Sequence, residues 1–169
     1  MPEITLLALD RSAAERLAGD ADAFAQRHGL TLAPHESTLV SIAEATMQML
    51  AAGGATIPWV GYLGLDGVSR HVVGTAGFKS APDAMGVVEI AYFTLPGHEG
   101  CGVATAMAVA LVQLAVDAGS AVAVVIAHTL AERNASCRVL EKAGFQQTGT
   151  VIDPEDGAVW RWERAISKK

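Results

Sequence analysis

The sequence predicts a mixed α/β fold of the α+β type, with a mostly antiparallel sheet flanked by helices. Residues 59–65 and 71–78 are predicted to form two strands of a hairpin joined by an Asp66-Gly67 turn. Residues 87–95, rich in β-branched, aromatic and aliphatic side chains, add a third strand. A glycine turn, a long apolar helix and an apolar run at residues 121–127 follow, which is the order of a parallel crossover.

Length and composition indicate one compact domain spanning residues 1–169. The chain is 51% hydrophobic with a mean hydropathy of +0.32, enough to bury a real core. The longest apolar region, residues 103–116, is shorter than a bilayer span and is interrupted by Thr105 and Gln113. The N-terminus lacks the basic region and apolar core of a signal peptide. We therefore expect a cytoplasmic protein with no membrane partner.

Charge and the spacing of cysteines and histidines argue against three further classes: a nucleic-acid-binding protein, a disulfide scaffold and a metal site. The net charge is −6, the pI is near 5.3, and no run of Lys or Arg occurs, which argues against a nucleic-acid surface. Cys101 and Cys137 are isolated, and the five histidines have no metal-ligand spacing. We expect neither a disulfide scaffold nor a metal site.

The first third of the chain is predicted to hold an edge strand and three helices. Their segments, in order, are residues 4–9 for the strand and residues 12–18, 21–28 and 37–52 for the helices. Ser12 and Asp20 are the predicted N-caps of the first two helices. Glycines mark the predicted helix ends, at Gly19, Gly29 and the Gly53-Gly54 pair.

The last third is predicted to continue the sheet around two more helices. Residues 103–118 form an apolar helix with one polar edge, and residues 121–127 form a strand buried on both faces whose end is marked by His128. Residues 135–143 form a shorter helix that starts after Asn134. The predicted terminal strand pair comprises residues 145–151 and 158–164.

The junction between residues 87–95 and the long helix is the strongest candidate site. Gly100 and Gly102 remove Cβ atoms where free N–H groups and the positive end of a helix dipole point outward, an arrangement that binds phosphate. A tight turn with no ligand is the alternative. A dinucleotide site is disfavoured, because it needs a third glycine and an acidic strand end where this chain has Thr105 and His128.

Several motifs follow one another in a specific order along the chain. They are the run at residues 89–92, Pro96, the Gly-Cys-Gly-Val-Ala-Thr run at 100–105, residues 127–130, residues 134–136 and residues 138–145. Together they resemble the GCN5-related N-acetyltransferase (GNAT) family, and within it they are closest to the ribosomal-protein N-terminal acetyltransferase branch. The resemblance is strongest from Gly86 to Phe145. It implies the GNAT fold, in which a central parallel pair of strands splays apart around acetyl-coenzyme A.

The resemblance assigns a set of coenzyme A-binding residues. They are Tyr92, Phe93 and Thr94 on the strand, Gly100, Cys101, Gly102, Val103, Ala104 and Thr105 on the turn, and Asn134 and Ser136 at the second helix. Glu99 departs from the family pattern, which has Arg or Gln there, and we expect its carboxylate to turn into solvent. Cys101 lies at the phosphate turn and is a structural residue rather than a nucleophile.

Two residues are candidates for proton transfer. Glu89 lies on the central strand, where burial is expected to raise its pKa toward neutrality, and related enzymes often use such a glutamate as base through a water. Ser136 matches the serine assigned to thiolate protonation, since Leu140 stands where many relatives have a tyrosine acid. Glu89 could instead be structural, Ser136 and Asn134 could be helix caps, and His128 is expected to pack or hydrogen-bond.

The implied activity is transfer of acetyl from acetyl-coenzyme A to a primary amine by direct attack in a ternary complex. The sequence does not identify the acceptor, which could be a small molecule or a protein N-terminus. A second copy of the chain, in a homodimer, is a further candidate partner. Trp59, Trp160 and Trp162, with the acidic loop at residues 153–156, could receive a cationic amine, or could simply be core and turn. The alternative to an enzyme is a non-catalytic sensor or scaffold that has the same fold and binds acyl-coenzyme A.

Overall fold

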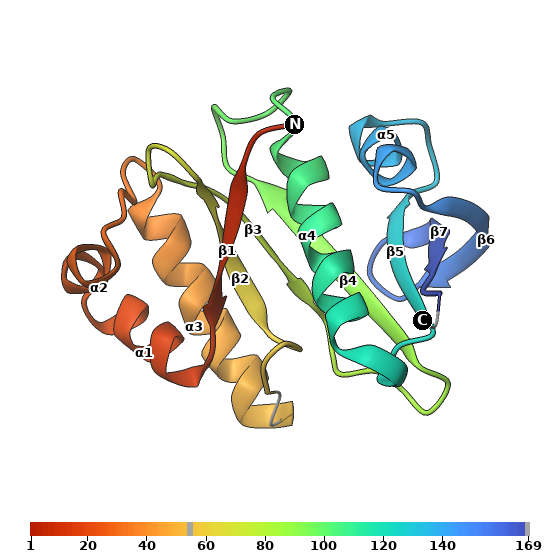
Figure 1. Cartoon of the computed structure of the whole chain (residues 1–169), viewed down its shortest axis with the longest axis horizontal. Coiled ribbons are helices and arrows are strands. Elements are labelled where there is room, and N and C mark those ends of the chain that lie inside the picture. The colour runs from red at the N-terminus through yellow and green to blue at the C-terminus, as the bar shows by residue number, and fades with distance from the viewer. Residues whose placement is uncertain (54–55, 168–169) are drawn as a thin grey trace.

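The computed structural model describes residues 1–53 and 56–167, which form one seven-stranded sheet flanked by helices (Figure 1). The strand order is β1-β2-β3-β4-β5-β7-β6. The strands are β1 Ile4–Leu9, β2 Gly61–Asp66, β3 Val72–Phe78, β4 Val87–Thr94, β5 Val124–Leu130, β6 Gln146–Asp153 and β7 Gly157–Ala165. The helices are α1 Arg11–Gly19, α2 Ala21–His28, α3 Glu36–Gly53, α4 Val103–Asp117 and α5 Ala135–Lys142, with a 3-10 turn at Gly119–Ala121.

The predicted α+β fold is confirmed. Strands β1 to β4 pair antiparallel in sequence order, β4 pairs parallel with β5, and β5, β7 and β6 pair antiparallel. The first strand lies at the sheet edge, as expected. None of the helices in the described parts of the chain has the length and apolarity needed to cross a bilayer.

Two local predictions were wrong. Helix α1 is capped by Asp10, whose side chain accepts the Ala13 N–H at 2.9 Å, so the helix begins one residue before the predicted cap Ser12. Strand β5 starts three residues later than predicted and runs on to Leu130, because the apolar run begins in a turn. His128 is therefore inside the strand rather than at its end. Gly54, which belongs to the Gly53-Gly54 pair predicted to end the third helix, lies outside the described residues.

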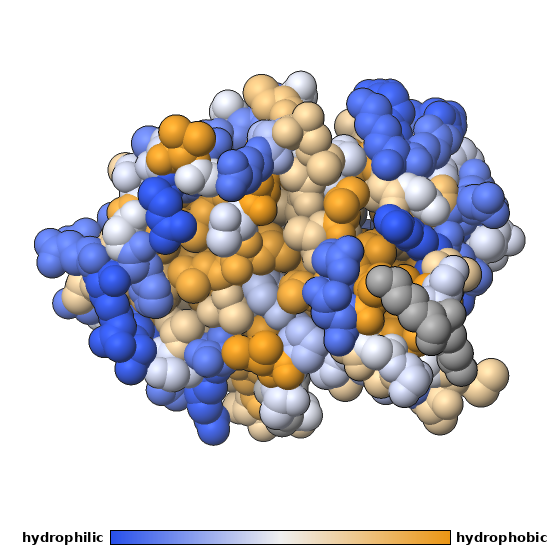
Figure 2. All heavy atoms as spheres, in the orientation of Figure 1, coloured by the Kyte–Doolittle hydropathy of each residue, from blue (hydrophilic) through white to orange (hydrophobic). Residues whose placement is uncertain are grey.

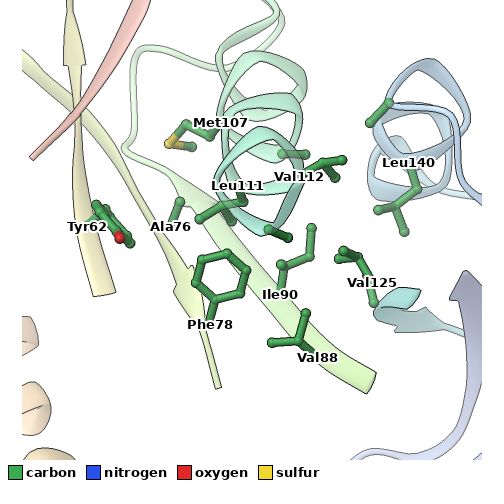
Figure 3. Close-up of a cluster of buried hydrophobic side chains, with 14 of the residues drawn as sticks. Tyr62, Ala76, Phe78, Val88, Ile90, Met107, Leu111, Val112, Val125 and Leu140 are labelled. Atoms are coloured by element: carbon green, nitrogen blue, oxygen red, sulfur yellow. The ribbon is translucent and has the colours of Figure 1, made fainter. Parts of the chain in front are cut away.

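Helix α4 covers one face of the sheet. Met107, Leu111 and Val112 pack against Phe78, Ile90 and neighbouring strand residues, all nearly inaccessible to solvent (Figure 3). The packing is close because strand residues under Met107 are glycines: a methyl group at Gly74 would lie 2.7 Å from the Met107 Cε. Helix α5 lies beside α4 over β5, with Leu140 in the same core (Figures 1 and 3). Leu140 is thus a core residue.

Helices α1 to α3 supply a second core on the opposite face. Leu63 and Leu65 of β2 pack with Leu39 of α3 and Phe24 of α2, whereas Gly64 between them faces Met107 of α4. Successive strand residues point to opposite faces, so the two helix groups sandwich the sheet. Hydrophilic residues gather at the two ends of the face drawn in Figure 2, and apolar ones in its middle.

Candidate active site

A cleft of about 540 Å³ lies where the end of β4, the glycine turn, the start of α4 and helix α5 meet. All but two of the residues predicted to bind coenzyme A line it. Those that do are Tyr92, Phe93, Thr94, Gly100, Gly102, Val103, Ala104, Thr105 and Ser136. The cleft therefore forms where the sequence places it.

The glycine turn fits a phosphate. Gly100 and Gly102 have φ values of 74° and 82°, in the left-handed region that favours glycine. Gly102 is the N-cap of α4 and no described side chain caps the helix, so the first-turn N–H groups are free to bind a ligand. A diphosphate there would also meet the positive end of the α4 dipole.

Two cations in the cleft were missed by the sequence prediction. Arg138 and Lys142 of α5 line the cleft opposite the glycine turn and are exposed. Their four-residue spacing puts them on one side of the helix. That spacing was the available signal, but only the fold shows that this side of α5 faces the turn. Both side chains can neutralise phosphate charge that backbone N–H groups only partly balance.

Glu99 lies at the cleft rim and remains charged. Its side chain is exposed, as expected, but it folds back so that its Oε2 accepts the Gly97 N–H at 2.8 Å. Backbone hydrogen bonds from its own N–H and from Gly97 hold the pKa of Glu99 below its ordinary value. The carboxylate thus stabilises the loop before α4 by accepting a hydrogen bond from its backbone.

A pair of hydroxyl groups bridges the cleft. The Tyr92 Oη on β4 and the Ser136 Oγ on α5 lie 2.9 Å apart, a hydrogen bond in which either can donate. Burial raises the pKa of Tyr92, an effect that the Ser136 hydrogen bond partly offsets. The sequence predicted Tyr92 as a coenzyme A-binding residue, and the structure shows that its hydroxyl contacts Ser136 across the cleft.

Two predicted coenzyme A ligands do not line the cleft. The Asn134 Oδ1 accepts the Cys137 N–H at 3.1 Å, so this side chain is the N-cap of α5. The Cys101 thiol is exposed and donates to the carbonyl oxygen of Glu99 at 3.5 Å. Asn134 retains its amide NH₂ for a ligand, whereas the only hydrogen bond of the Cys101 thiol among the described residues is this one within the turn.

Glu89, Lys79 and His128 form a charged cluster on the other face of the sheet. The Glu89 Oε1 lies 2.7 Å from the Lys79 Nζ and 2.8 Å from the His128 Nδ1. Burial raises the pKa of Glu89, but hydrogen bonds and charge from Lys79 and His128 outweigh it, and the net pKa is lowered. The expectation that the pKa of Glu89 is raised toward neutrality was therefore wrong.

The splay between β4 and β5 connects this cluster to the cleft. Pairing of the two strands covers residues 87–89 against 124–126 and stops there. Ile90 and Tyr92 face α4, so Glu89, which neighbours Ile90, faces the opposite side. Beyond Glu89 and Ile126, the described residues of β4 and β5 form no further backbone pairs. The sheet is therefore open between the Glu89 cluster and the Tyr92–Ser136 bridge.

Two of the three tryptophans are packing residues, one of the two alternatives that the sequence left open. Trp162 is 2% exposed and donates its Nε1–H to the Thr129 Oγ1 at 3.0 Å, so it belongs to the core. Trp59 packs edge-on against Phe78 with ring centroids 5.0 Å apart. In the acidic loop, backbone hydrogen bonds from Asp156 and Glu155, and to a smaller extent the charges of Lys79 and His128, lower the pKa of Asp153.

Comparison with known proteins gives the same architecture. A family model described as an acetyltransferase (GNAT) domain matches residues 4–146. RimL, a ribosomal L7/L12 alpha-N-protein acetyltransferase in complex with coenzyme A, is 16% identical with a TM-score of 0.68, over 98% of this chain and 96% of that chain. MccE, a microcin C7 self-immunity acetyltransferase in complex with acetyl-CoA and AMP, is 18% identical with a TM-score of 0.67, over 97% and 93%.

A third similar structure is the aminoglycoside acetyltransferase AAC(6')-Ib in complex with coenzyme A. It is 19% identical with a TM-score of 0.67, over 96% of this chain and 95% of that chain. At these identities the similarity shows a shared fold. No curated protein matches the sequence.

Proposed function

Because this chain belongs to the GNAT acetyltransferase family, we propose that it transfers an acetyl group from acetyl-coenzyme A to a primary amine by direct attack in a ternary complex. The supporting observation is the cleft, where a glycine turn with free helix N–H groups lies beside a strand that has left its parallel partner. Acetyl-coenzyme A supplies the activated thioester. The first turn of α4, with Arg138 and Lys142, would hold its phosphates.

The proposed reaction has two proton transfers. The amine nitrogen forms a bond to the acetyl carbon, and the carbon–sulfur bond breaks with its electron pair going to sulfur. One proton leaves the amine and one reaches the sulfur. The fold offers one group for each transfer, on opposite faces of the sheet, and the splay allows both to reach the same centre.

His128 is the proposed base, with Glu89 as its positioning partner. An ionised Glu89 is a weak base, since its pKa is held low by Lys79 and His128. The same carboxylate accepts the Nδ1–H of His128, which fixes the ring and leaves the Nε2 to take a proton. This arrangement exchanges the roles that the sequence suggested for Glu89 and His128.

The Tyr92–Ser136 pair is the proposed acid. Leu140 is buried in the core and cannot donate a proton, whereas both hydroxyls line the cleft. A hydroxyl that accepts a hydrogen bond becomes a better donor, so Tyr92 can support Ser136 as it protonates the sulfur. The family resemblance suggested Ser136 alone.

We further propose that residues 1–169 act as a single domain in the cytoplasm. A single sheet carries strands from both ends of the chain, and both faces of β4, near its middle, contribute to the site. The catalytic parts would therefore not survive separation into halves.

A non-catalytic acyl-coenzyme A sensor is the second candidate, favoured by Leu140 at the usual acid position and by Glu99 at the phosphate turn. Titration with acetyl-coenzyme A, followed by thiol release with a panel of amines and peptides, separates the two. The enzyme should bind acetyl-coenzyme A and release coenzyme A only when an amine is present. Binding without turnover on any acceptor would favour the sensor, and no binding would refute both.

A further inference from the structure

A hollow lies on the face of the sheet that α3 covers, because the paired residues that cross β2, β3 and β4 at this point are two glycines and an alanine. Gly61 of β2 pairs with Gly77 of β3, and Gly77 pairs with Ala91 of β4. Above this row is a cavity of about 300 Å³, roofed by Ile42, Thr46 and Met49 of α3. A methyl group added at Gly61 would meet no atom within 4 Å, so the space above it is open.

The hollow adjoins the proposed reaction centre. Tyr92 and Phe93 line both this cavity and the coenzyme A cleft, so β4 is the shared wall. Lys79, at the end of the hollow, contacts Glu89, which in turn holds His128. An amine at His128 could therefore extend its substituent along the Gly61 row without leaving the α3 face.

The charges of the hollow select against polyamines. Among the described residues that line it, Lys79 is the only charged side chain, and none carries a carboxylate. The rest of the lining is largely apolar, with Phe93 52% and Met49 48% exposed. A second ammonium group further along the hollow would lose water there and find no carboxylate among the lining residues. An apolar group would instead gain from burial.

We propose that this hollow binds the apolar substituent of the acceptor, a primary amine with a single positive charge on an aromatic or branched aliphatic group. This inference rests on the proposed acetyltransferase function. The same chemistry occurs in a free monoamine and at the N-terminus of a peptide whose first residue is apolar. In both, the amine would lie at the Glu89–His128 end. It would first lose one ammonium proton to solvent, attack the acetyl carbon as the neutral amine, and give its second proton to His128 as the amide bond forms.

The experiment compares phenethylamine, a short peptide that begins with phenylalanine, and spermidine. Coenzyme A release and calorimetric binding in the presence of coenzyme A are measured for each. At least one apolar acceptor should exceed spermidine by about tenfold or more in kcat/KM. The acceptor that does so identifies the source. A preference for spermidine would overturn the inference even though the protein is an acetyltransferase.

Filling the hollow provides a matched test. Gly61→Leu should raise the KM for the apolar acceptor by about tenfold and leave acetyl-coenzyme A binding unchanged. Gly149→Leu is the control, because a methyl group at this β6 glycine also meets no atom within 4 Å. Equal effects of the two variants would refute the hollow as the binding site.

A charge variant tests selectivity in the opposite direction. Met49→Glu places a carboxylate in the half-exposed roof and should reduce the preference for the apolar acceptor over spermidine by several-fold. If no amine is acetylated but phenethylamine still binds in a Gly61-dependent way, the proposed function fails and the hollow stands. If neither apolar acceptor binds, the hollow is refuted.

Discussion

The two sides of β4 are encoded in the sequence in different ways. On the α4 side, the cofactor cleft is built mostly from one continuous stretch, the end of β4, the turn and the first residues of α4. On the α3 side, Lys79, Glu89 and His128 come from three separate strands or strand ends. Backbone N–H groups bind phosphate locally, whereas proton transfer needs side chains that only the sheet register brings together.

The largest effect is expected on acetyl-coenzyme A affinity, because phosphate binding at the glycine turn depends on backbone N–H groups. Gly102→Val forces a β-branched residue into a φ of 82° and brings a Cβ to 3.1 Å from the Pro2 Cδ, which costs about 1–3 kcal/mol of stability. It should also displace the N–H groups of the α4 first turn. We expect acetyl-coenzyme A affinity to fall by more than about 100-fold, measured by calorimetry.

Gly119→Val is the matched control for this variant. Gly119 follows the other end of α4, has a φ of 78°, and has open space around its Cβ position. It should lose comparable stability in urea unfolding while binding acetyl-coenzyme A normally. Equal loss of affinity in both variants would mean that strain, and not the phosphate turn, controls binding.

The α3 side should respond with a pH signature rather than a loss of cofactor. His128→Gln is expected to lower kcat by about 100-fold and to remove the acidic limb of the pH–rate profile between about pH 5 and pH 9. Glu89→Gln should lower kcat by about tenfold and retain that limb, because the imidazole loses its positioning partner but not its proton site. If Glu89→Gln removes the limb and His128→Gln does not, Glu89 is the base.

This difference explains what the sequence could and could not predict. The glycine turn, the order of strands and the resemblance located Tyr92, Gly102 and Ser136, because each lies within a local motif. The opposite face depends on strand register: Glu89 pairs with Ile126, and His128, two residues further along β5 on the same face, contacts the Glu89 carboxylate at 2.8 Å. Composition gives no information on this register.

The direction of the Glu89 pKa shift was also mispredicted, because one of its charged partners is distant in sequence. Glu89 was expected to have a raised pKa from desolvation alone, but Lys79 lies beyond a loop and contacts it from the end of β3. Arg138 and Lys142 were overlooked for a similar reason, since nothing local shows which side of α5 faces the turn. In each case the chemistry followed from neighbours that only the fold supplies.

The hydroxyl bridge should give an intermediate effect. Ser136→Ala removes the proposed donor to sulfur, and we expect kcat to fall by about tenfold to thirtyfold with little change in acetyl-coenzyme A affinity. Tyr92→Phe should lower kcat less, because Ser136 remains. A thioester donor with a more acidic leaving thiol should largely rescue both variants; no rescue would mean that the pair is structural.

A smaller effect is expected from the cations of α5. Arg138→Gln and Lys142→Gln should each weaken acetyl-coenzyme A binding by about threefold to tenfold, and the loss should shrink at high salt, because both side chains are exposed. Arg133→Gln is the control, since Arg133 pairs with Glu141 on the surface and does not line the cleft. Loss of affinity in the control would contradict the assignment.

The smallest effect concerns acid stability on the α3 side. The pKa of Glu89 lies below its ordinary value of 4.5, so its ionised form stabilises the fold above that pH, and this stability is lost as pH falls through the folded-state pKa. Lys79→Met removes one cause of the lowering. We expect it to lower the free energy of unfolding slightly at neutral pH and to reduce the further loss of stability between about pH 5 and pH 3, measured by urea unfolding.

Arg133→Met is the control. It breaks an exposed ion pair with Glu141 and should change this acid dependence less. The same dependence in both variants would mean that Lys79 and Glu89 interact no more strongly than an exposed surface pair.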